Sequence, residues 1–229
     1  MSLFELLVGV VAPPACVGCG QEGSALCRDC SGLQRREFVP ACFWCGALGE
    51  GARTCPGCRR RSYLFAASAA GEYTPQLRAL VRRYKFDHQR VAVAPMAALL
   101  AERLKLFVPA GVWVTGVPSA TTHVRRRSFD HGRLLARATA RGAGYAFAPV
   151  LRRTGQQRQV GANRERRLKQ LKETFYVPQG QAALVAGRDW LVVDDISTTG
   201  ASLNEAARAL KAAGGRRVFA VVLAKKDKK

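Results

Sequence analysis

The sequence predicts an α/β fold, an open and mostly parallel sheet flanked by helices, preceded by a small cysteine-rich module. Three observations predict it. All 8 cysteines lie between Cys16 and Cys58. After them, segments typical of strands alternate with segments typical of helices. Near the C-terminus, an apolar strand, a polar loop, a helix and another strand follow one another, which is the order found in open sheets that bind ligands beyond the carboxyl ends of their strands.

The cysteines form an internal repeat with the spacing of metal ligands. They occur as Cys-x-x-Cys pairs, and a glycine follows the first pair of each unit. Four thiolates suit a tetrahedral Zn²⁺ site. A module of about 50 residues with few large apolar side chains needs a metal to stabilise its fold. Disulfides are disfavoured in a cytosolic chain, and a redox motif would occur singly. We therefore predict two closed, structural zinc sites, formed within each unit or in a crossed arrangement of the first pair with the third. Their ligands are Cys16, Cys19, Cys27, Cys30, Cys42, Cys45, Cys55 and Cys58.

Charge and cysteine content divide the chain into two expected domains. Residues 1–70 have a net charge of +2 and residues 71–229 a net charge of +19. We predict an N-terminal helix and double zinc ribbon over 1–62 and the α/β domain over 63–229. The boundary is expected near 63–71, where Ala and Ser dominate.

The composition indicates a folded protein that attracts polyanions. Of the 229 residues, 48% are hydrophobic and 23% are charged, which excludes general disorder. The net charge of +21 favours nucleic acids, although arginines that only keep the protein soluble would give the same charge. No apolar stretch reaches the ~20 residues that span a bilayer, and the N-terminus lacks the basic region of a signal peptide. We therefore expect a cytoplasmic protein.

Periodicity predicts the elements of the larger domain. Helices are expected at 76–86, 91–106, 132–141, 163–172 and 203–213. Strands are expected at 112–117, 190–193 and 218–223, with a short extended run around 145–151. The strand at 190–193 is fully apolar, as buried parallel strands are.

The loop after the strand at 190–193 has the composition of a ribose 5-phosphate site. Two carboxylates are followed by hydroxyls and a glycine at the start of a helix, where backbone N–H groups bind phosphate. Gly200 allows close approach of the backbone, and the carboxylates suit ribose hydroxyls, directly or through Mg²⁺. An ordinary capped helix would explain one or two of these residues but not the ordered set. The expected site residues are Asp194, Asp195, Ser197, Thr198, Thr199, Gly200, Ala201 and Ser202.

This segment resembles the phosphoribosyl pyrophosphate (PRPP) motif of type I phosphoribosyltransferases, and nearly the whole chain resembles the ComF (ComFC) family of competence proteins. The resemblance implies a type I phosphoribosyltransferase-like fold that binds PRPP with Mg²⁺. Beyond the cysteines and the PRPP motif, it rests on Lys85-Phe86, Val117-Pro118, Arg125-Arg126-Arg127-Ser128-Phe129-Asp130-His131, Thr154, Gln159-Val160-Gly161, Arg167 and Phe175.

The resemblance also implies a loop that approaches pyrophosphate. Ser128 replaces the glycine usual in the family, and Asp130 and His131 replace an amide pair. Thr198 and Ala201 stand where purine-salvage enzymes have an Asp and a Lys, which disfavours a purine-salvage reaction. No catalytic residue is assigned, since His88, His123 and His131 lie in no acid–base constellation and are expected to be solvated. The pyrophosphate-loop candidates are Val117, Pro118, Ser119, Arg125 and Arg127.

For function, the resemblance implies handling of single-stranded DNA during natural transformation, beside the competence helicase. A basic run at 152–172 fits a track for the phosphate backbone, with Tyr176 or Phe175 available for stacking, or equally a solvated helix. The alternative function is an active phosphoribosyltransferase with an unidentified nucleobase or amine acceptor, and a third is a scaffold with a vestigial PRPP loop. The nucleic-acid candidates are Arg152, Arg153, Arg158, Arg164, Arg166, Arg167, Lys169 and Lys172.

Overall fold

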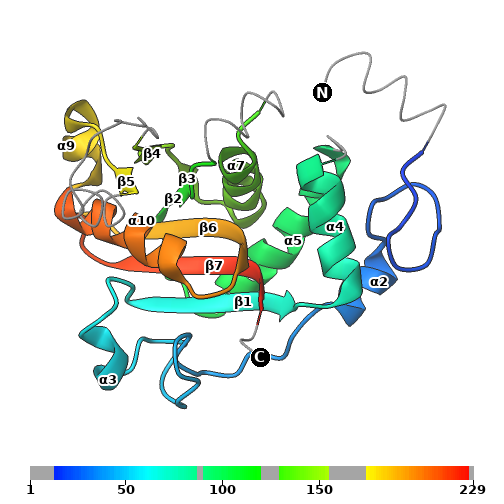
Figure 1. Ribbon diagram of the computed structural model, residues 1–229, viewed down its shortest axis with the longest axis horizontal. Coiled ribbons are helices and arrows are strands. Elements are labelled where there is room, and N and C mark those ends of the chain that lie inside the picture. The colour runs from blue at the N-terminus through cyan, green and yellow to red at the C-terminus, as the bar shows by residue number, and fades with distance from the viewer. Residues whose placement is uncertain (1–12, 87–89, 120–128, 155–173, 227–229) are drawn as a thin grey trace, which may run out of the picture.

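A five-stranded parallel sheet forms the centre of the protein (Figure 1). The computed structural model describes residues 13–86, 90–119, 129–154 and 174–226. The strand order is β1-β7-β6-β2-β3, so the last two strands of the chain lie in the middle of the sheet. The strands are β1 (Ala66–Glu72), β2 (Trp113–Gly116), β3 (Ala146–Phe147), β6 (Trp190–Ser197) and β7 (Val218–Lys225). This arrangement confirms the predicted fold class.

Helices cover both faces of the sheet. Side chains alternate along β6, so that Leu191 and Val193 pack under the helices of one layer and Val192 packs under those of the other. The first layer contains α4 (Pro75–Phe86), α5 (Val93–Leu104) and α7 (His131–Ala143). The second contains α9 (Ala182–Val185) and α10 (Ala201–Ala212). Short elements complete the domain: η1 (Arg90–Ala92), η2 (Gln179–Gln181) and the antiparallel pair β4 (Arg152–Arg153) and β5 (Phe175–Tyr176).

The two cysteine units lie against different parts of this domain (Figure 1). The first unit, residues 16–30, leads into α2 (Arg28–Leu33) beside α4, and its Leu26 joins the core under α4 and α5. The second unit, residues 42–58, includes the start of α3 (Pro56–Arg59) next to β1, and its Phe43 joins the core on the α10 side. Each unit therefore completes a different hydrophobic core.

The structure differs from the predicted elements in four places. The segment at 66–72, for which no element was predicted, is strand β1, whose small side chains gave no strand signal yet pair in register with β7. Strand β6 continues to Ser197 and includes both aspartates, because it stays paired with β7 along that length. The helix expected at 91–106 begins at Val93 after a 3₁₀ turn, and only Ala146–Phe147 of the run at 145–151 is a strand.

Three further predictions concern the basic helix, the domain boundary and membrane-spanning segments. The basic helix expected at 163–172 lies outside the described residues. The domain boundary at 62/63 stays a prediction. Within the part of the chain that the structure describes, we find no helix with both the length and the apolar character needed to span a membrane.

Candidate functional site

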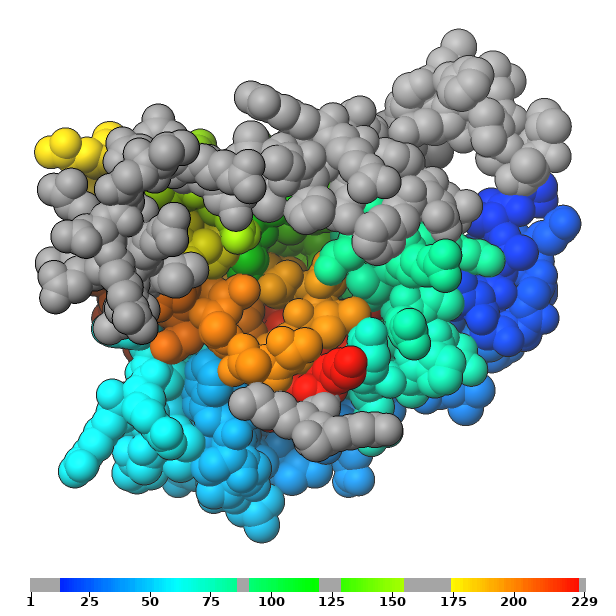
Figure 2. All heavy atoms as spheres, in the orientation of Figure 1, coloured from blue at the N-terminus to red at the C-terminus, as the bar shows by residue number. Residues whose placement is uncertain are grey.

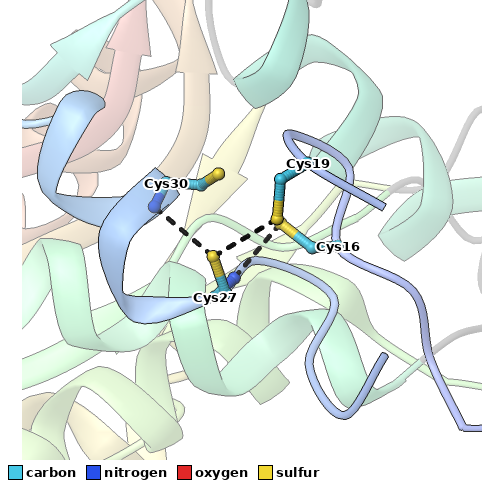
Figure 3. Close-up of side chains that lie close together, drawn as sticks. All are labelled: Cys16, Cys19, Cys27 and Cys30. Carbon is cyan, nitrogen blue, oxygen red and sulfur yellow. Dashed lines mark hydrogen bonds between the residues drawn. The ribbon is translucent and has the colours of Figure 1, made fainter. Parts of the chain in front are cut away.

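Each cysteine unit brings its own four sulfur atoms together. The ligand atoms of each group lie within 4.8 Å of one another, so the structure has the sequential grouping and not the crossed one. Figure 3 shows the first cluster, in which two cysteines come from a loop and two from the start of α2. The Sγ atoms of Cys19 and Cys27 are 3.7 Å apart, and those of Cys45 and Cys55 are 3.5 Å apart. The groups are Cys16, Cys19, Cys27 and Cys30, and Cys42, Cys45, Cys55 and Cys58.

The same tight turn builds the first pair of each unit. The N–H of Gly20 donates to the carbonyl of Cys16 at 3.0 Å, and the N–H of Gly46 donates to the carbonyl of Cys42 at 2.8 Å. Both glycines have a positive φ, of 78° and 75°, a conformation that glycine adopts without strain. The glycine after each first pair is therefore required by the turn.

The electrostatics of the clusters fit a bound cation. Burial raises the pKa of Cys16, but hydrogen bonds from the backbone N–H of Cys27 and of nearer neighbours lower it to about 6. Hydrogen bonding with the Cys27 side chain, and then burial, raise the pKa of Cys30 to about 12. The pKa of Cys42 is likewise about 6 and that of Cys58 about 12. Four thiolates this close repel one another, and a divalent cation relieves that repulsion, so the donor sets could hold zinc.

Two adjacent aspartates stand at the carboxyl end of β6. Asp195 is buried, and the Nζ of Lys85, in the last turn of α4, lies 2.8 Å from its Oδ1 and 2.7 Å from its Oδ2. Asp194 accepts the backbone N–H of Asp195 at 2.9 Å. Burial and the neighbouring Asp195 carboxylate raise the pKa of Asp194 to about 7. One carboxylate is thus held by a lysine, while the other has a second oxygen that no hydrogen-bond donor among the described residues takes up.

The loop after the aspartates presents unpaired backbone donors. Within the described residues, no acceptor takes the backbone N–H of Thr198, Thr199 or Gly200, and the buried hydroxyl of Ser197 has no partner. The N–H of Ala201, the first residue of α10, reaches only the Thr199 hydroxyl, at 3.3 Å. Ser202 follows in the exposed first turn. Free amides at the start of a helix form an anion site. The structure therefore brings the eight expected residues together along one strand end, loop and helix start.

An open pocket of about 530 Å³ adjoins this loop, and the second cysteine unit forms its other wall. Figure 2 shows the loop and the start of α10 (orange) at the surface between that unit (blue to cyan) and the end of β7 (red). Sequence reasoning missed other lining residues of this pocket because each is separated from the loop by many residues along the chain. The missed residues are Trp44, Arg61, Lys225 and Lys226.

A second pocket, of about 330 Å³, lies beyond the end of β2. Pro118 and Ser119 line it, together with Arg133 from the first turn of α7. Gly132 allows the close approach of α7, because a β-carbon there would lie 1.9 Å from the carbonyl oxygen of Val117. Three of the five pyrophosphate-loop candidates therefore lie at this strand end. Arg125 and Arg127 lie outside the described residues.

Two expectations about aromatic and histidine side chains are wrong. His131 is not solvated: it is 2% exposed, and its Nε2 lies 2.9 Å from the carbonyl oxygen of Tyr84. Phe175 is 1% exposed and is unavailable for stacking, because it packs under α10. Tyr176 is 48% exposed and pairs across the β4–β5 ladder with Arg152. His88 and His123 lie outside the described residues.

Among the basic candidates, the structure describes two. Arg152 and Arg153 form β4 and are both exposed, and both line the pocket beyond β2. The guanidinium of Arg153 lies 5.5 Å from the centre of the Phe175 ring. The remaining candidates lie outside the described residues: Arg158, Arg164, Arg166, Arg167, Lys169 and Lys172.

Comparison with known proteins agrees with this architecture. Residues 130–229 match the phosphoribosyl transferase domain family. The competence protein ComFC of Streptococcus pneumoniae is 26% identical over 203 residues, which cover 86% of each chain. The DNA utilization protein YhgH of Salmonella typhi is 26% identical over 196 residues, covering 81% of this chain and 83% of that one.

Among solved structures, the glutamine PRPP amidotransferase from B. subtilis complexed with ADP and GMP matches with a TM-score of 0.44 and 16% identity. The match covers 58% of this chain and only 27% of that enzyme. The two relatives above, in contrast, match over 86% and 81% of this chain. Over most of its length the chain is similar to the competence protein ComFC, and it carries a phosphoribosyl transferase domain behind two four-cysteine units.

Proposed function

We propose that the protein binds PRPP with Mg²⁺ at the carboxyl end of β6 and handles single-stranded DNA in the cytoplasm during natural transformation. The observation that carries the first part is the set of free amides at Thr198, Thr199 and Gly200 directly after two aspartates. The amides bind the 5-phosphate, since they have no other acceptor among the described residues.

The aspartates have different parts in this proposal. Asp194 binds the ribose hydroxyls with the oxygen that no neighbour takes up, while Lys85 fixes the position of Asp195 through both carboxylate oxygens. Pro118 and Ser119, at the next strand end, approach the pyrophosphate. When bound, Mg²⁺ supplies the positive charge that neutralises the pyrophosphate.

Calorimetry with PRPP and Mg²⁺ tests this site. Asp194→Asn removes one acceptor charge and is expected to weaken binding at least about tenfold, as loss of a hydrogen bond to a charged group does. Asp29→Asn makes the same charge change on exposed α2, far from the loop, and is the matched control. Equal affinity of the two variants would contradict the assignment of Asp194.

The DNA-handling part rests on charge and on the relatives. Arg152 and Arg153 present exposed guanidinium groups on β4, and Tyr176 presents an exposed ring directly across the ladder. Guanidinium groups bind phosphates and aromatic rings stack on bases, the two contacts that single strands use. One relative is named as a competence protein and the other as a DNA utilization protein. The competence helicase is the proposed protein partner.

Binding of a labelled single strand, measured over a range of salt concentrations, tests this part. We expect affinity to fall steeply with salt, and Arg152→Ala to lower the slope of log affinity against log salt by about 1. Arg78→Ala removes an exposed arginine from α4 and is the matched control. Salt-insensitive binding, or the same slope change in the control, would remove the physical basis of this part.

An active transferase is the second candidate function. We call residues 198–201, which bind the 5-phosphate in this proposal, the phosphate loop. The pocket of about 530 Å³ beside this loop leaves room for an acceptor, a nucleobase or an amine. Pyrophosphate release from PRPP, screened over such acceptors, tests it. Release that depends on an acceptor and is lost in Asp194→Asn would support the transferase.

For the cysteine units we propose two structural zinc ions, one in each cluster. All four sulfurs of each group face one another, so neither site leaves a ligand position for substrate. The zinc ions therefore stabilise the units and take no part in chemistry.

A further inference from the structure

Trp44 of the second cysteine unit lies directly on the phosphate loop. A β-carbon placed on Gly200 would be 2.3 Å from Cζ3 of Trp44, so the indole ring contacts the bare backbone of this glycine. Gly200 has a φ of 75° and precedes α10 as its N-cap. The residue on which the shape of the anion site depends is thus covered by a side chain from a different part of the chain.

The cysteine cluster holds this ring in place. Trp44 stands between Cys42 and Cys45 in the tight turn, so both flanking residues belong to the donor set. Its Nε1–H donates to Ser62 Oγ at 2.9 Å, and its ring packs edge-to-face on Phe43 with centroids 5.7 Å apart. The side chain therefore has little freedom while the unit is folded.

Two further contacts join the second unit and the segment after it to the elements around the loop. Asn204, in the first turns of α10, accepts the N–H of Tyr63 at 2.9 Å and donates to the carbonyl of Arg61 at 3.2 Å. Lys225, at the end of β7, donates to the carbonyl of Phe43, and its Nζ lies 4.8 Å from the centre of that ring. α10, which follows the loop, and β7, which pairs with the strand before it, are thus both tied to this part of the chain.

We propose that the second cysteine unit, when it holds its metal, orders the phosphate loop through Trp44 and so sets the affinity of the loop for a phosphorylated ligand. The ligand assignment rests on the proposed function above. The first unit has no such role, because Gly18 stands at the position equivalent to Trp44 and the unit packs beside α4. Metal in the second cluster is therefore a regulator of ligand binding, and metal in the first cluster is not.

The physical basis is a coupling between two sites. Without its metal, a unit this small does not stay folded. Trp44 then leaves Gly200, and the loop loses one wall and becomes open to water. Ordering the loop again on binding costs free energy, so affinity falls by about tenfold, within the usual range for coupled sites.

The test compares Cys45→Ser with Cys19→Ser, since these are equivalent exposed cysteines of the two units. Hydrogen exchange at the loop is measured on both variants at Asn204, whose N–H donates to the carbonyl of Gly200 at 2.9 Å. Calorimetry with PRPP and Mg²⁺ is measured on both as well. We expect faster exchange and about tenfold weaker binding for Cys45→Ser only. Trp44→Ala is expected to reproduce both effects while keeping its metal. Unchanged loop exchange in Cys45→Ser or in Trp44→Ala, or equal effects of the two cysteine variants, would overturn the proposal.

Tryptophan fluorescence gives a second readout on the full chain. Trp113 and Trp190 begin β2 and β6, at the opposite end of the sheet from the loop, so Trp44 is the reporter of the pocket. PRPP or inorganic phosphate is expected to change the emission of the wild type and not that of Trp44→Phe. If the wild type binds no PRPP, the proposed function fails, while loop exchange still decides whether the second unit orders the loop.

Discussion

The two cysteine units have the same local structure but contact different parts of the protein. In each, a glycine of positive φ closes the turn of the first pair, and backbone N–H groups point at the sulfur of the first cysteine. The first unit packs Leu26 into the core under the helices, whereas the second lies over the phosphate loop. The same cysteine turn thus supports the core under the helices in one copy and lines a pocket beside residues 198–201 in the other.

One position accounts for most of this difference. A β-carbon on Gly18 would lie 2.6 Å from the Sγ of Cys30, so the first unit has no space for a side chain there. In the second unit the equivalent Trp44 points out of the cluster toward Gly200. The metal-binding turn is therefore compatible with a large side chain only where that side chain finds a partner outside the unit.

The largest expected effect comes from breaking one cluster at a time. Cys30→Ser and Cys58→Ser each remove one sulfur ligand, and each variant is expected to lose one of two zinc ions. Since the metal supplies folding free energy on the order of 10 kcal/mol in such small sites, the affected unit unfolds locally. Metal analysis and limited proteolysis measure this. Loss of both ions from a single substitution would show that the clusters are not independent.

A smaller effect is expected from Asp189, which directly precedes β6 at its amino end. Burial raises the pKa of Asp189, but hydrogen bonds from Arg216 and Arg217 outweigh it and lower the pKa to about 2. Asp189→Asn is expected to lower the free energy of unfolding by about 2 kcal/mol at pH 7, because it removes charged hydrogen bonds from a buried acceptor.

The effect of Asp189 should depend on pH in a defined direction. A carboxyl group with a lowered pKa stabilises the fold above its unfolded pKa of about 3.9, and this stabilisation is lost as the pH falls toward 2. Denaturant unfolding of the wild type and of Asp189→Asn should therefore differ above pH 4 and converge near pH 2. The wild type and Asp189→Asn should both keep two zinc ions at pH 7. Loss of metal from only one unit would mean that the ion pairs of Asp189 stabilise that unit in particular and not the sheet as a whole.

The sequence predicted those features of the cysteine units and of the phosphate loop that involve residues close together along the chain. The Cys-x-x-Cys pairs and the segment from Asp194 to Ser202 are local patterns. The structure groups the cysteines in two clusters and places the segment over the end of β6, the loop after it and the start of α10. The contact between Trp44 and Gly200 was not predictable, because it joins residues far apart in the chain and gives no periodic signal. Strand β1 was missed for a related reason, since its alanines form a strand only through pairing with β7.

A substitution at Gly18 sharpens the difference between the units. Gly18→Ala places a methyl group against the Sγ of Cys30, which is expected to cost about 1.5 kcal/mol and to weaken zinc binding in the first cluster. Gly57→Ala, in the second unit, is the matched control because a β-carbon there meets no atom within 4 Å. Competition with a chelator measures the metal affinity of each cluster. Equal behaviour of the two variants would show that the first turn has more room than its contacts indicate.

The smallest expected effect separates the two contacts of Trp44. Trp44→Phe keeps an aromatic ring on Gly200 but removes the Nε1–H that donates to Ser62. A single neutral hydrogen bond contributes about 1 kcal/mol, so PRPP affinity should fall by no more than about fivefold, less than for Trp44→Ala. Ser62→Ala removes the same bond from the other side and should give the same loss in calorimetry. A loss in Trp44→Phe as large as in Trp44→Ala would mean that the hydrogen bond, and not the packing of the ring on Gly200, holds the loop in shape.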